Sequence, residues 1–469
     1  MGKHTGKHIH LMGICGTAMA SLAGLFKSLG ANVTGSDQNV YPPMSTQLEK
    51  LGIKIKEGYK KENLIPRPDL VIVGNVIRKD YDEPMALLAS DIPYTSLPKA
   101  IGEYVIEDRH SIVVSGTHGK TTTTSMMAWV AECVGEKPGF LIGGIPRNYT
   151  YSFKIPEGNF FVIEGDEYDT AFFDKVPKFV HYKPKSVILT SVEFDHVDIY
   201  KDMSEVKKAF DLLMNLIPAD GNLISWAEGE HVVDAAKKCK AKNNLSYGLN
   251  KGDFQAKNIT FDNDFCQFDV ELKGEKIDHI KLKAFGKHNI LNALAVYALA
   301  KTLNWDLAKV RKGLETFEGV KRRQEIIGTP NNITVIEDFA HHPTAVDVTV
   351  ESIKERYPKN KVFALFEPRS ATSRRNIFQD DYISAFAKAD VTILPDVYSA
   401  QTLKEDERLS PEIIVKALQK KGKEAHLIPH IDDIVSFLKN NAKPGDAVLV
   451  MSNGAFGGIY QKILTALAK

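Results

Sequence analysis

Cysteine and long apolar runs are both scarce in this chain of 469 residues. The four cysteines, Cys15, Cys133, Cys239 and Cys266, are scattered. They lack both the close pairs of a zinc site and the density of a secreted disulfide scaffold. No run of roughly 18 apolar residues indicates a membrane span, and the opening residues run into a strand without a signal-like stretch. We therefore expect reduced thiols in a cytoplasmic protein that does not enter a membrane.

An excess of either charge is also missing. Lys and Arg number 60 and Asp and Glu number 59, so the formal net charge is +1. Such a chain has no overall field to attract nucleic acid or an anionic membrane, and we expect neither partner. There is no tandem repeat to indicate a solenoid. The length and a hydrophobic content of 43% instead predict about three domains.

Short apolar runs alternate with helical segments in three successive stretches. HIHLMG, ANVTGSD and DLVIVGN lie in the first, SIVVSG opens the second, and KVFALFEP, DVTILPDV and DAVLVMSNG lie in the third. This alternation predicts parallel strands joined by crossover helices. Residues 221 to about 285 look mostly β-like, and HNILNALAVYALAKTL reads as the last long helix of the second stretch. We predict an α/β protein with domains at residues 1–107, 108–326 and 327–469.

The segment SIVVSGTHGKTTTT combines a strand, a glycine turn and a helix start. Backbone N–H groups and the helix dipole can bind phosphate at such a turn. Lys120 would neutralise the β- and γ-phosphates, and the Thr121 hydroxyl would help to hold Mg²⁺. Val114 stands where the common Gly-x-x-x-x-Gly-Lys-Thr pattern has glycine, so the loop is a compact one. The predicted ATP-binding residues are Gly116, Thr117, His118, Gly119, Lys120, Thr121 and Thr122.

Acidic groups follow two further apolar strands. Glu164, Asp166, Glu167 and Asp169 follow the first, and Glu193, Asp195, His196 and Asp198 follow the second. Carboxylates suit Mg²⁺ beside a nucleotide, and a neutral histidine nitrogen suits a second metal. A solvated loop and a structural histidine are the alternative interpretations. We predict that the catalytic residues are Lys120, Glu164 and His196.

Near the amino terminus, GICGTAM follows the strand HIHLM, and GSD follows the next strand. The pair is typical of a dinucleotide-binding turn with an acidic ribose contact. However, Cys15 and Ala18 occupy positions that are glycine in the Gly-x-Gly-x-x-Gly pattern. A diphosphate-bearing substrate is therefore favoured over a hydride carrier, although the turn could also serve packing alone. The candidate residues are Gly13, Cys15, Gly16, Thr17, Ser36 and Asp37.

Motifs spread over all three stretches resemble the Mur ligase family. They are GICGTAM, GSDQNVYPPMSTQLE, GTHGKTTT, EGDEYDTAFFDK, EFDHVDIY, GKHNILNALA and EDFAHHP. The longer segments, among them DEYDTAFFDKVPKFVHYKP, resemble the murein peptide ligase branch of that family. The resemblance implies a Rossmann-like amino-terminal domain that binds a UDP-sugar and a P-loop ATPase-type central domain. It further implies a Rossmann-like carboxy-terminal domain that binds the incoming peptide and closes on ATP.

In this family, ATP and Mg²⁺ activate a carboxylate as an acyl phosphate, which an amine then attacks. For the murein peptide branch the substrates would be UDP-N-acetylmuramate and the tripeptide L-alanyl-γ-D-glutamyl-meso-diaminopimelate, in peptidoglycan recycling. By resemblance, Thr121 and Glu164 hold the nucleotide Mg²⁺ and His196 holds another Mg²⁺. The implied nucleotide contacts are His288 and Asn292 with adenine, Arg323 with phosphate and Asp338 with ribose.

The segment FEPRSATSRRN follows a strand of the third stretch, and its guanidinium groups suit the carboxylates of an acidic peptide. The candidate peptide-binding residues are Arg369, Ser370, Thr372 and Arg374. A solvated basic loop would explain the same residues, and a salt-bridged hinge would explain Arg323 and Asp338.

Four other functions are alternatives. A UDP-N-acetylmuramate:L-alanine ligase would use the same nucleotide, metal and acyl-phosphate chemistry with a different amine pocket. Ligases that act on folate or polyamide chains share the compact phosphate loop but give no reason for the amino-terminal turn. If the chain were a nucleotide-gated binding module or an NAD-dependent dehydrogenase, its phosphate loop would have a regulatory role.

Overall fold

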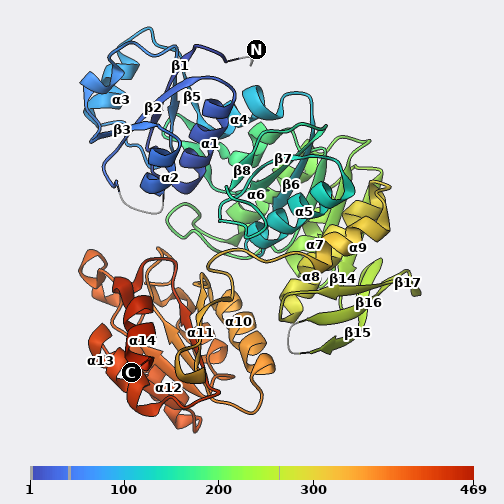
Figure 1. Ribbon diagram of the computed structural model, residues 1–469, viewed down its shortest axis with the longest axis vertical. Coiled ribbons are helices and arrows are strands. Elements are labelled where there is room, and N and C mark those ends of the chain that lie inside the picture. Colours follow the sequence, from blue (N-terminus) through green and yellow to red (C-terminus); the bar gives the residue numbers. More distant parts are fainter. Residues whose placement is uncertain (1–3, 41–43, 263–264, 469) are drawn as a thin grey trace.

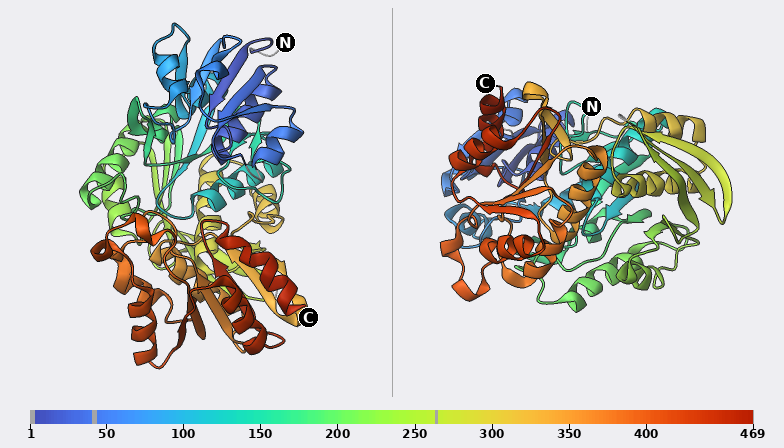
Figure 2. Two further views of the ribbon diagram at one scale, coloured as in Figure 1. Left: turned by 90° about the vertical axis from the view of Figure 1, so that its left-hand side faces the viewer. Right: turned by 90° about the horizontal axis from the view of Figure 1, so that it is seen from below.

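The computed structural model describes residues 4–40, 44–262 and 265–468, which fold into three α/β units (Figure 1). Each unit has its own large sheet, so the expected division into three α/β regions is confirmed. The amino-terminal unit and the carboxy-terminal unit both lie against the central one (Figure 2). Within the described ranges, none of the helices is both long enough and apolar enough to cross a membrane. All four cysteines are free thiols.

The amino-terminal sheet has five parallel strands in the order β3-β2-β1-β4-β5. Its strands are β1 (His8–Met12), β2 (Asn32–Asp37), β3 (Lys54–Glu57), β4 (Leu70–Val73) and β5 (Tyr94–Ser96). Its helices are α1 (Thr17–Ser28), α2 (Met44–Lys50), α3 (Asp82–Leu88) and α4 (Leu97–Ile101). From β1 the chain adds β2 and β3 on one side of β1 within the sheet, and it then crosses over to add β4 and β5 on the other side. A ligand-binding crevice is expected at such a switch point, beyond the carboxyl end of β1.

Helix α1 also joins this unit to the central one. The Ser21 and Ser152 hydroxyls share a buried hydrogen bond of 2.7 Å. Gly24 faces the Phe153 ring so closely that a Cβ there would lie 2.1 Å from a ring carbon. A larger residue at position 24 would therefore force the two units apart.

The central sheet has ten strands in the order β17-β16-β15-β14-β13-β12-β6-β9-β7-β8. Its strands are β6 (His110–Ser115), β7 (Gly139–Leu141), β8 (Phe153–Lys154), β9 (Phe160–Gly165), β12 (Ser186–Leu189), β13 (Asn222–Trp226), β14 (Asn243–Gly248), β15 (Phe254–Phe261), β16 (Cys266–Leu272) and β17 (Glu275–Leu282). A separate hairpin is formed by β10 (Asp169–Ala171) and β11 (Asp174–Pro177). The strands β9, β6 and β12 are parallel neighbours, so their carboxyl ends meet at one edge.

The helices of this unit are α5 (Lys120–Val134), α6 (Met203–Leu216), α7 (Glu230–Ala236), α8 (Lys287–Thr302) and α9 (Leu307–Glu315). Helix α8 matches the expected long helix and is buried almost all round, against α5 and strands β13 to β15. An apolar composition on every side suits that position. The β-rich stretch from residue 221 also contains α7, and the chain forms α9 before it leaves the unit. Neither helix is part of the expected pattern.

The carboxy-terminal sheet has the order β18-β19-β23-β20-β21-β22, with β18 antiparallel at one edge. Its strands are β18 (Glu325–Gly328), β19 (Thr334–Asp338), β20 (Val362–Phe366), β21 (Val391–Leu394), β22 (Glu424–Leu427) and β23 (Ala447–Met451). Its helices are α10 (Pro343–Arg356), α11 (Gln379–Ala385), α12 (Pro411–Lys420), α13 (Ile431–Asn441) and α14 (Ile459–Leu467). Helices α10 to α12 pack on one face, and α13 and α14 pack on the other. The chain enters this sheet through β18, which straddles the division expected between residues 326 and 327.

Candidate active site

The glycine loop from Gly116 to Gly119, predicted to bind phosphate and called the phosphate loop below, joins β6 to α5. Gly116 and Gly119 have φ angles of +134° and +82°, values that side chains with a Cβ rarely tolerate. A Cβ on Gly116 would also lie 2.3 Å from Thr190 Oγ1. Lys120, Thr121 and Thr122 form the first turn of α5. The loop therefore presents its backbone at a helix N-terminus, as the sequence predicted for phosphate binding.

Lys120 is folded back over this loop. Its ammonium donates to Gly116 O at 2.7 Å and to Glu167 Oε2 at 3.1 Å, and lies 3.8 Å from Asp166 Oδ1. Burial disfavours the charged ammonium, but the carboxylates of Glu167 and Asp166 outweigh it and raise the pKa of Lys120. Lys120 is therefore a permanent cation whose present partners a phosphate could replace.

Glu164, at the end of β9, is the carboxylate that faces the helix start. Its Oε2 accepts from the Thr121 hydroxyl at 2.9 Å and its Oε1 accepts from Gly143 N at 2.6 Å. Burial, and then the charge of Asp166, raise the pKa of Glu164. A hydroxyl and a carboxylate oxygen are ligands that Mg²⁺ prefers, and a cation would offset the unfavourable burial of charge. These residues therefore fit a magnesium ion.

His196 approaches the same region from the second acidic turn, which follows β12. Its φ is +55°, and its ring packs against Tyr168 at 5.0 Å between centroids. Its Nε2 lies 3.6 Å from Glu167 Oε1. Because the other oxygen of Glu167 binds Lys120, the structure brings the predicted residues His196 and Lys120 to a shared carboxylate.

The second acidic turn is also tied to the phosphate loop. The Thr117 hydroxyl donates to Glu193 O at 3.2 Å and accepts from Glu193 N at 2.8 Å. His118 N donates to Ser191 Oγ at 2.8 Å, and His118 O accepts from the Thr190 hydroxyl at 2.5 Å. The position of the phosphate loop therefore depends on residues 190–193.

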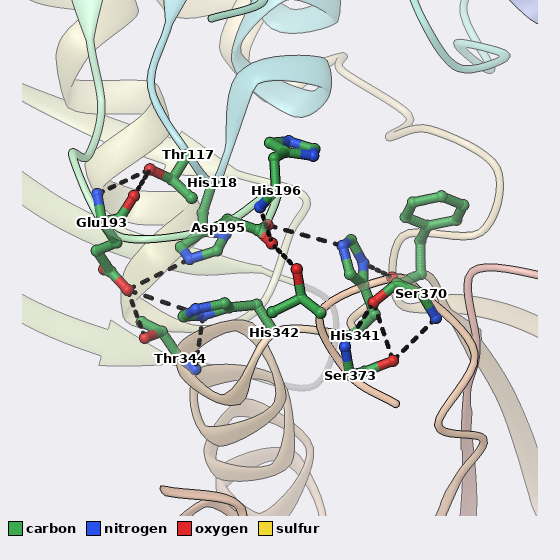
Figure 3. A network of polar contacts seen from close by, with 12 residues as sticks. Thr117, His118, Glu193, Asp195, His196, His341, His342, Thr344, Ser370 and Ser373 are labelled. Carbon is green, nitrogen blue, oxygen red and sulfur yellow. Dashed lines mark hydrogen bonds and ion pairs between the residues drawn. The ribbon is translucent and has the colours of Figure 1, made fainter. Parts of the chain in front are cut away.

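The other side of this turn meets the carboxy-terminal unit (Figure 3). The Thr344 hydroxyl donates to Glu193 Oε2 at 2.6 Å. The Thr372 hydroxyl donates to Asp195 Oδ1 at 2.6 Å, and His341 Nε2 lies 4.0 Å from Asp195 Oδ2. Burial opposes ionisation of Asp195, but the nearby histidines 196 and 341 hold its pKa well below the usual range. The turn thus connects the phosphate loop to the third unit.

His288 and Asn292 lie one turn apart near the start of α8. Asn292 is beside the phosphate loop, since a Cβ on Gly119 would lie 3.0 Å from its Oδ1. His288 Nε2 lies 3.3 Å from Gln324 Nε2, and burial lowers the pKa of His288 to about 4. The ring is therefore neutral at physiological pH and suited to an uncharged base rather than to phosphate.

Arg323 and Asp338 occupy the junction with the carboxy-terminal unit. Arg323 stacks over the Phe339 ring at 4.8 Å from its centroid. Burial lowers its pKa, while the charges of Asp338 and Glu164 act in the opposite direction. Asp338 accepts from Gln324 N and Ala340 N, each at 2.7 Å, and burial raises its pKa. The two predicted residues are thus near one another, with Arg323 within electrostatic reach of Glu164.

Of the four predicted peptide-binding residues, only Thr372 touches the second acidic turn. Ser370 shares a hydrogen bond of 2.9 Å with the Ser373 hydroxyl. The Arg369 guanidinium lies 3.8 Å from the Tyr398 ring centroid. The Arg374 guanidinium donates to Thr402 Oγ1 at 3.0 Å and thus is directed toward the loop beyond β21. In this conformation Arg374 lies away from the turn.

The amino-terminal candidates form a separate turn at the carboxyl ends of β1 and β2. Asp37 Oδ2 accepts from Cys15 N at 2.8 Å, and Ser36 O accepts from Gly13 N at 2.8 Å. Gly13 has a φ of +82°, and Gly16 and Thr17 start α1. Because Asp37 is hydrogen-bonded to this backbone, the turn and Asp37 are held together at the switch point of the sheet.

Two residues that contribute to the site, Lys178 and Gly143, are not among the predicted ones. Lys178 donates to Asp166 Oδ2 at 3.0 Å, and its ammonium lies 4.0 Å from the Tyr168 ring centroid. Gly143 supplies the backbone N–H that holds Glu164. Lys178 lies in the long segment that resembles the murein peptide ligase branch, but that segment assigned it no role, and its burial beside an acidic turn becomes visible only in the fold.

Sequence comparisons agree with this arrangement. Three family profiles match in chain order: the Mur ligase family catalytic domain at residues 8–109, the Mur ligase middle domain at 114–300, and the Mur ligase glutamate ligase domain at 322–454. A relative from Escherichia coli (strain K12), UDP-N-acetylmuramate--L-alanyl-gamma-D-glutamyl-meso-2,6-diaminoheptandioate ligase, is 41% identical over 98% of both chains. This chain belongs to the Mur ligase family.

Two more Mur ligases span nearly the whole chain. The UDP-N-acetylmuramate--L-alanine ligase of Clostridium tetani (strain Massachusetts / E88) is 36% identical and covers 96% of each chain. The crystal structure of a murein peptide ligase from Psychrobacter arcticus 273-4 superimposes with a TM-score of 0.71, at 38% identity and 99% coverage of both chains. The family expected from the motifs, and its three-unit α/β architecture, are therefore confirmed.

Proposed function

We propose that this protein is an ATP-dependent amide ligase that joins UDP-N-acetylmuramate to L-alanyl-γ-D-glutamyl-meso-diaminopimelate in peptidoglycan recycling. The observation that carries the proposal is the 41% identity, over 98% of both chains, to a ligase named for those two substrates. The site supports it, since a glycine loop, a buried cation and a buried carboxylate meet beside the junction with the third unit.

The three units divide the substrates between them. Residues 1–107 bind the UDP-sugar at the turn built from Gly13, Cys15, Gly16, Thr17, Ser36 and Asp37. Residues 108–326 bind ATP, and residues 327–469 bind the incoming peptide and close on the nucleotide. The support for this assignment is the position of each candidate turn at the carboxyl ends of parallel strands, where α/β proteins bind ligands.

Within the central unit, Lys120 and the backbone of the phosphate loop bind the β- and γ-phosphates. Thr121 and Glu164 hold one Mg²⁺, and His196 contributes to a second. Bound Mg²⁺ supplies positive charge that neutralises the transferring phosphoryl group. His288 and Asn292 contact adenine, while Arg323 and Asp338 reach phosphate and ribose.

The reaction proceeds in two transfers. A lactyl carboxylate oxygen of the muramate attacks the γ-phosphorus, the bond to the β-phosphate oxygen breaks, and ADP leaves. The alanine amine of the tripeptide then attacks the acyl carbon, and inorganic phosphate leaves as the amide forms. Lys120 stabilises the charge that develops during the first transfer, and closure of the third unit keeps water from the acyl phosphate.

The third unit supplies the peptide contacts, for which Arg369, Ser370, Thr372 and Arg374 are the candidates. Arginine binds carboxylates in a bidentate manner, and the tripeptide carries several carboxylates. Arg374 would have to leave Thr402 in order to take part. The cytoplasm, where ATP is available, is the proposed compartment.

A coupled phosphate-release assay tests the proposal. With ATP, Mg²⁺ and UDP-N-acetylmuramate present, the tripeptide should give rapid phosphate release and an amide product that mass spectrometry detects. Free L-alanine at the same concentration should give much less. Reactions without an amine or without the sugar nucleotide are the controls, and neither should release phosphate.

The second candidate is the single-alanine ligase, favoured by the 36% identity to the Clostridium tetani enzyme. The same assay separates the two. Faster turnover with free alanine than with the tripeptide would replace the first proposal with the second, and no product with either amine would reject both.

A further inference from the structure

Three potential metal ligands meet where the phosphate loop faces the carboxy-terminal unit. We call His118, Glu193 and His342 the interdomain triad (Figure 3). His118 belongs to the phosphate loop and Glu193 to the second acidic turn, whereas His342 stands just before α10. Two of the three therefore come from the central unit and one from the carboxy-terminal unit.

The spacing of the triad suits a small transition-metal ion. Glu193 Oε2 lies 3.4 Å from His118 Nε2 and 3.8 Å from His342 Nδ1, and the three ligand atoms all lie within 4.8 Å of one another. Bonds of about 2.0–2.1 Å in a tetrahedral zinc site place neighbouring ligand atoms roughly 3.4 Å apart. Small side-chain movements would complete that geometry.

Each ligand atom is available in the required form. His342 Nε2 donates to Phe194 O at 3.2 Å, so the lone pair is on Nδ1, which faces Glu193. Carbonyls fix the tautomer of metal-binding histidines in this way. In this structure Nδ1 of His342 accepts a long hydrogen bond of 3.4 Å from Thr344 N, which a metal would replace. His118 Nε2 is shielded from solvent and faces Glu193 Oε2 at 3.4 Å.

The protonation states are also favourable. Burial opposes the charge on Glu193, but the hydrogen bond and charge of His118 prevail and lower its pKa to about 2. Burial lowers the pKa of His342 to about 4. A bound metal would supply to Glu193 the positive charge that His118 now supplies.

One side of the triad is open. A cavity of about 560 Å³ is lined by Glu193 and His342 together with Phe194, Met203, His231 and Phe378. It provides an entry path and room for water as a fourth ligand. Three protein ligands and one open position are typical of zinc sites that exchange a ligand.

From this geometry we propose that the interdomain triad binds a divalent transition metal, Zn²⁺ in type, which fastens the carboxy-terminal unit to the phosphate loop. Two imidazoles and one carboxylate favour zinc over magnesium, which prefers oxygen ligands. Because both units supply ligands, the metal stabilises this arrangement of the units over arrangements that separate His342 from Glu193. The site is distinct from the magnesium ligands proposed above.

Cobalt(II) is a suitable probe, since tetrahedral coordination intensifies its visible absorption. The full-length protein, stripped of metal and kept in excess Mg²⁺ without ATP, should bind one equivalent of Co²⁺ with that spectrum, and Zn²⁺ should displace it. Glu193→Gln and His342→Ala should each weaken binding by more than the roughly 10–100-fold that the loss of an outer partner costs. His342→Asn, which keeps a side-chain acceptor before α10, replaces His342→Ala if the latter does not fold.

Two further variants localise the site. His231→Ala removes the remaining histidine at the cavity, and His196→Ala removes a proposed magnesium ligand; both should keep the wild-type affinity for Co²⁺. The proposal is overturned if wild type binds no stoichiometric Co²⁺, if Glu193→Gln binds as wild type does, or if His231→Ala or His196→Ala abolishes binding. The measurement needs no substrate, so its outcome is independent of the ligase assay.

Discussion

The two acidic turns of the central unit arise from the same sequence pattern, yet the fold gives them different partners. Each follows a buried apolar strand beside the phosphate loop. Glu164 and Asp166, in the first turn, bind Thr121 and Lys178 of their own unit. Glu193 and Asp195, in the second, reach Thr344 and Thr372 of the carboxy-terminal unit.

The electrostatic consequences have opposite signs. Burial and the neighbouring Asp166 raise the pKa of Glu164, so its ionised form is under strain until a cation arrives. For Glu193 the influence of His118 overcomes burial and lowers the pKa to about 2, so its ionised form is already stabilised. The first turn therefore lacks a cation that would stabilise ionised Glu164, whereas the second turn already stabilises ionised Glu193 and also contacts the carboxy-terminal unit.

We expect the largest effect from replacing Lys120, whose ammonium contacts carboxylates of the first turn. Lys120→Ala should reduce turnover by roughly 10³-fold or more, since loss of one preorganised charge-stabilising group commonly costs 10²–10³-fold and Lys120 carries a full charge. Steady-state phosphate release measures this. The control is Lys137→Ala, at an exposed lysine paired with Glu157. Near-normal activity of Lys120→Ala would contradict the assignment of the active site to Lys120 and the first turn.

Glu164→Gln should separate function from stability. We expect the Mg²⁺ affinity and turnover to fall on the order of 100-fold, with a roughly unchanged fold. Without Mg²⁺ the variant should melt above wild type, since the raised pKa means that ionised Glu164 costs stability at neutral pH. The difference in melting temperature should vanish as the pH falls below the raised pKa of Glu164, because the wild-type carboxylate is then protonated. A lower melting temperature than wild type at neutral pH would contradict the contrast between the turns.

Glu193→Gln should give the opposite result. A folded-state pKa of about 2, below the value of 4.5 for an unperturbed glutamate, means that Glu193 contributes stability above pH 4.5 that is lost as the pH falls toward 2. We expect the variant to lose about 1–3 kcal/mol at pH 7, and the difference from wild type to shrink below pH 4. Thermal unfolding at a series of pH values tests both statements, and a difference that stays constant with pH would contradict the assignment.

The sequence predicted the first turn more completely than the second. Glycine positions, strand ends and the family motifs were enough to predict the α/β units, the glycine loop at the start of a helix and the meeting of Thr121 with Glu164. They could not show that Glu193 and Asp195 meet Thr344 and Thr372, because these contacts span roughly 150 to 180 positions and depend on how two units pack. Motif spacing contains no such information. Lys178 was missed for a different reason: the hairpin of β10 and β11, which returns the chain to Asp166, is not visible in the motif spacing.

We expect the smallest effect from weakening the contact between the second turn and the carboxy-terminal unit. Thr372→Val removes the buried hydroxyl that donates to Asp195 at 2.6 Å but keeps the side-chain volume. The backbone N–H of His196 still donates to Asp195, so the loss should be near about 1 kcal/mol, or roughly five-fold. We expect it as a higher KM for the peptide with kcat nearly unchanged, since closure of the unit becomes less favourable. Thr372→Ser, which keeps the hydroxyl, should restore the wild-type KM. A fall in kcat alone would instead place Thr372 at the reacting atoms, and the two turns would then share one role.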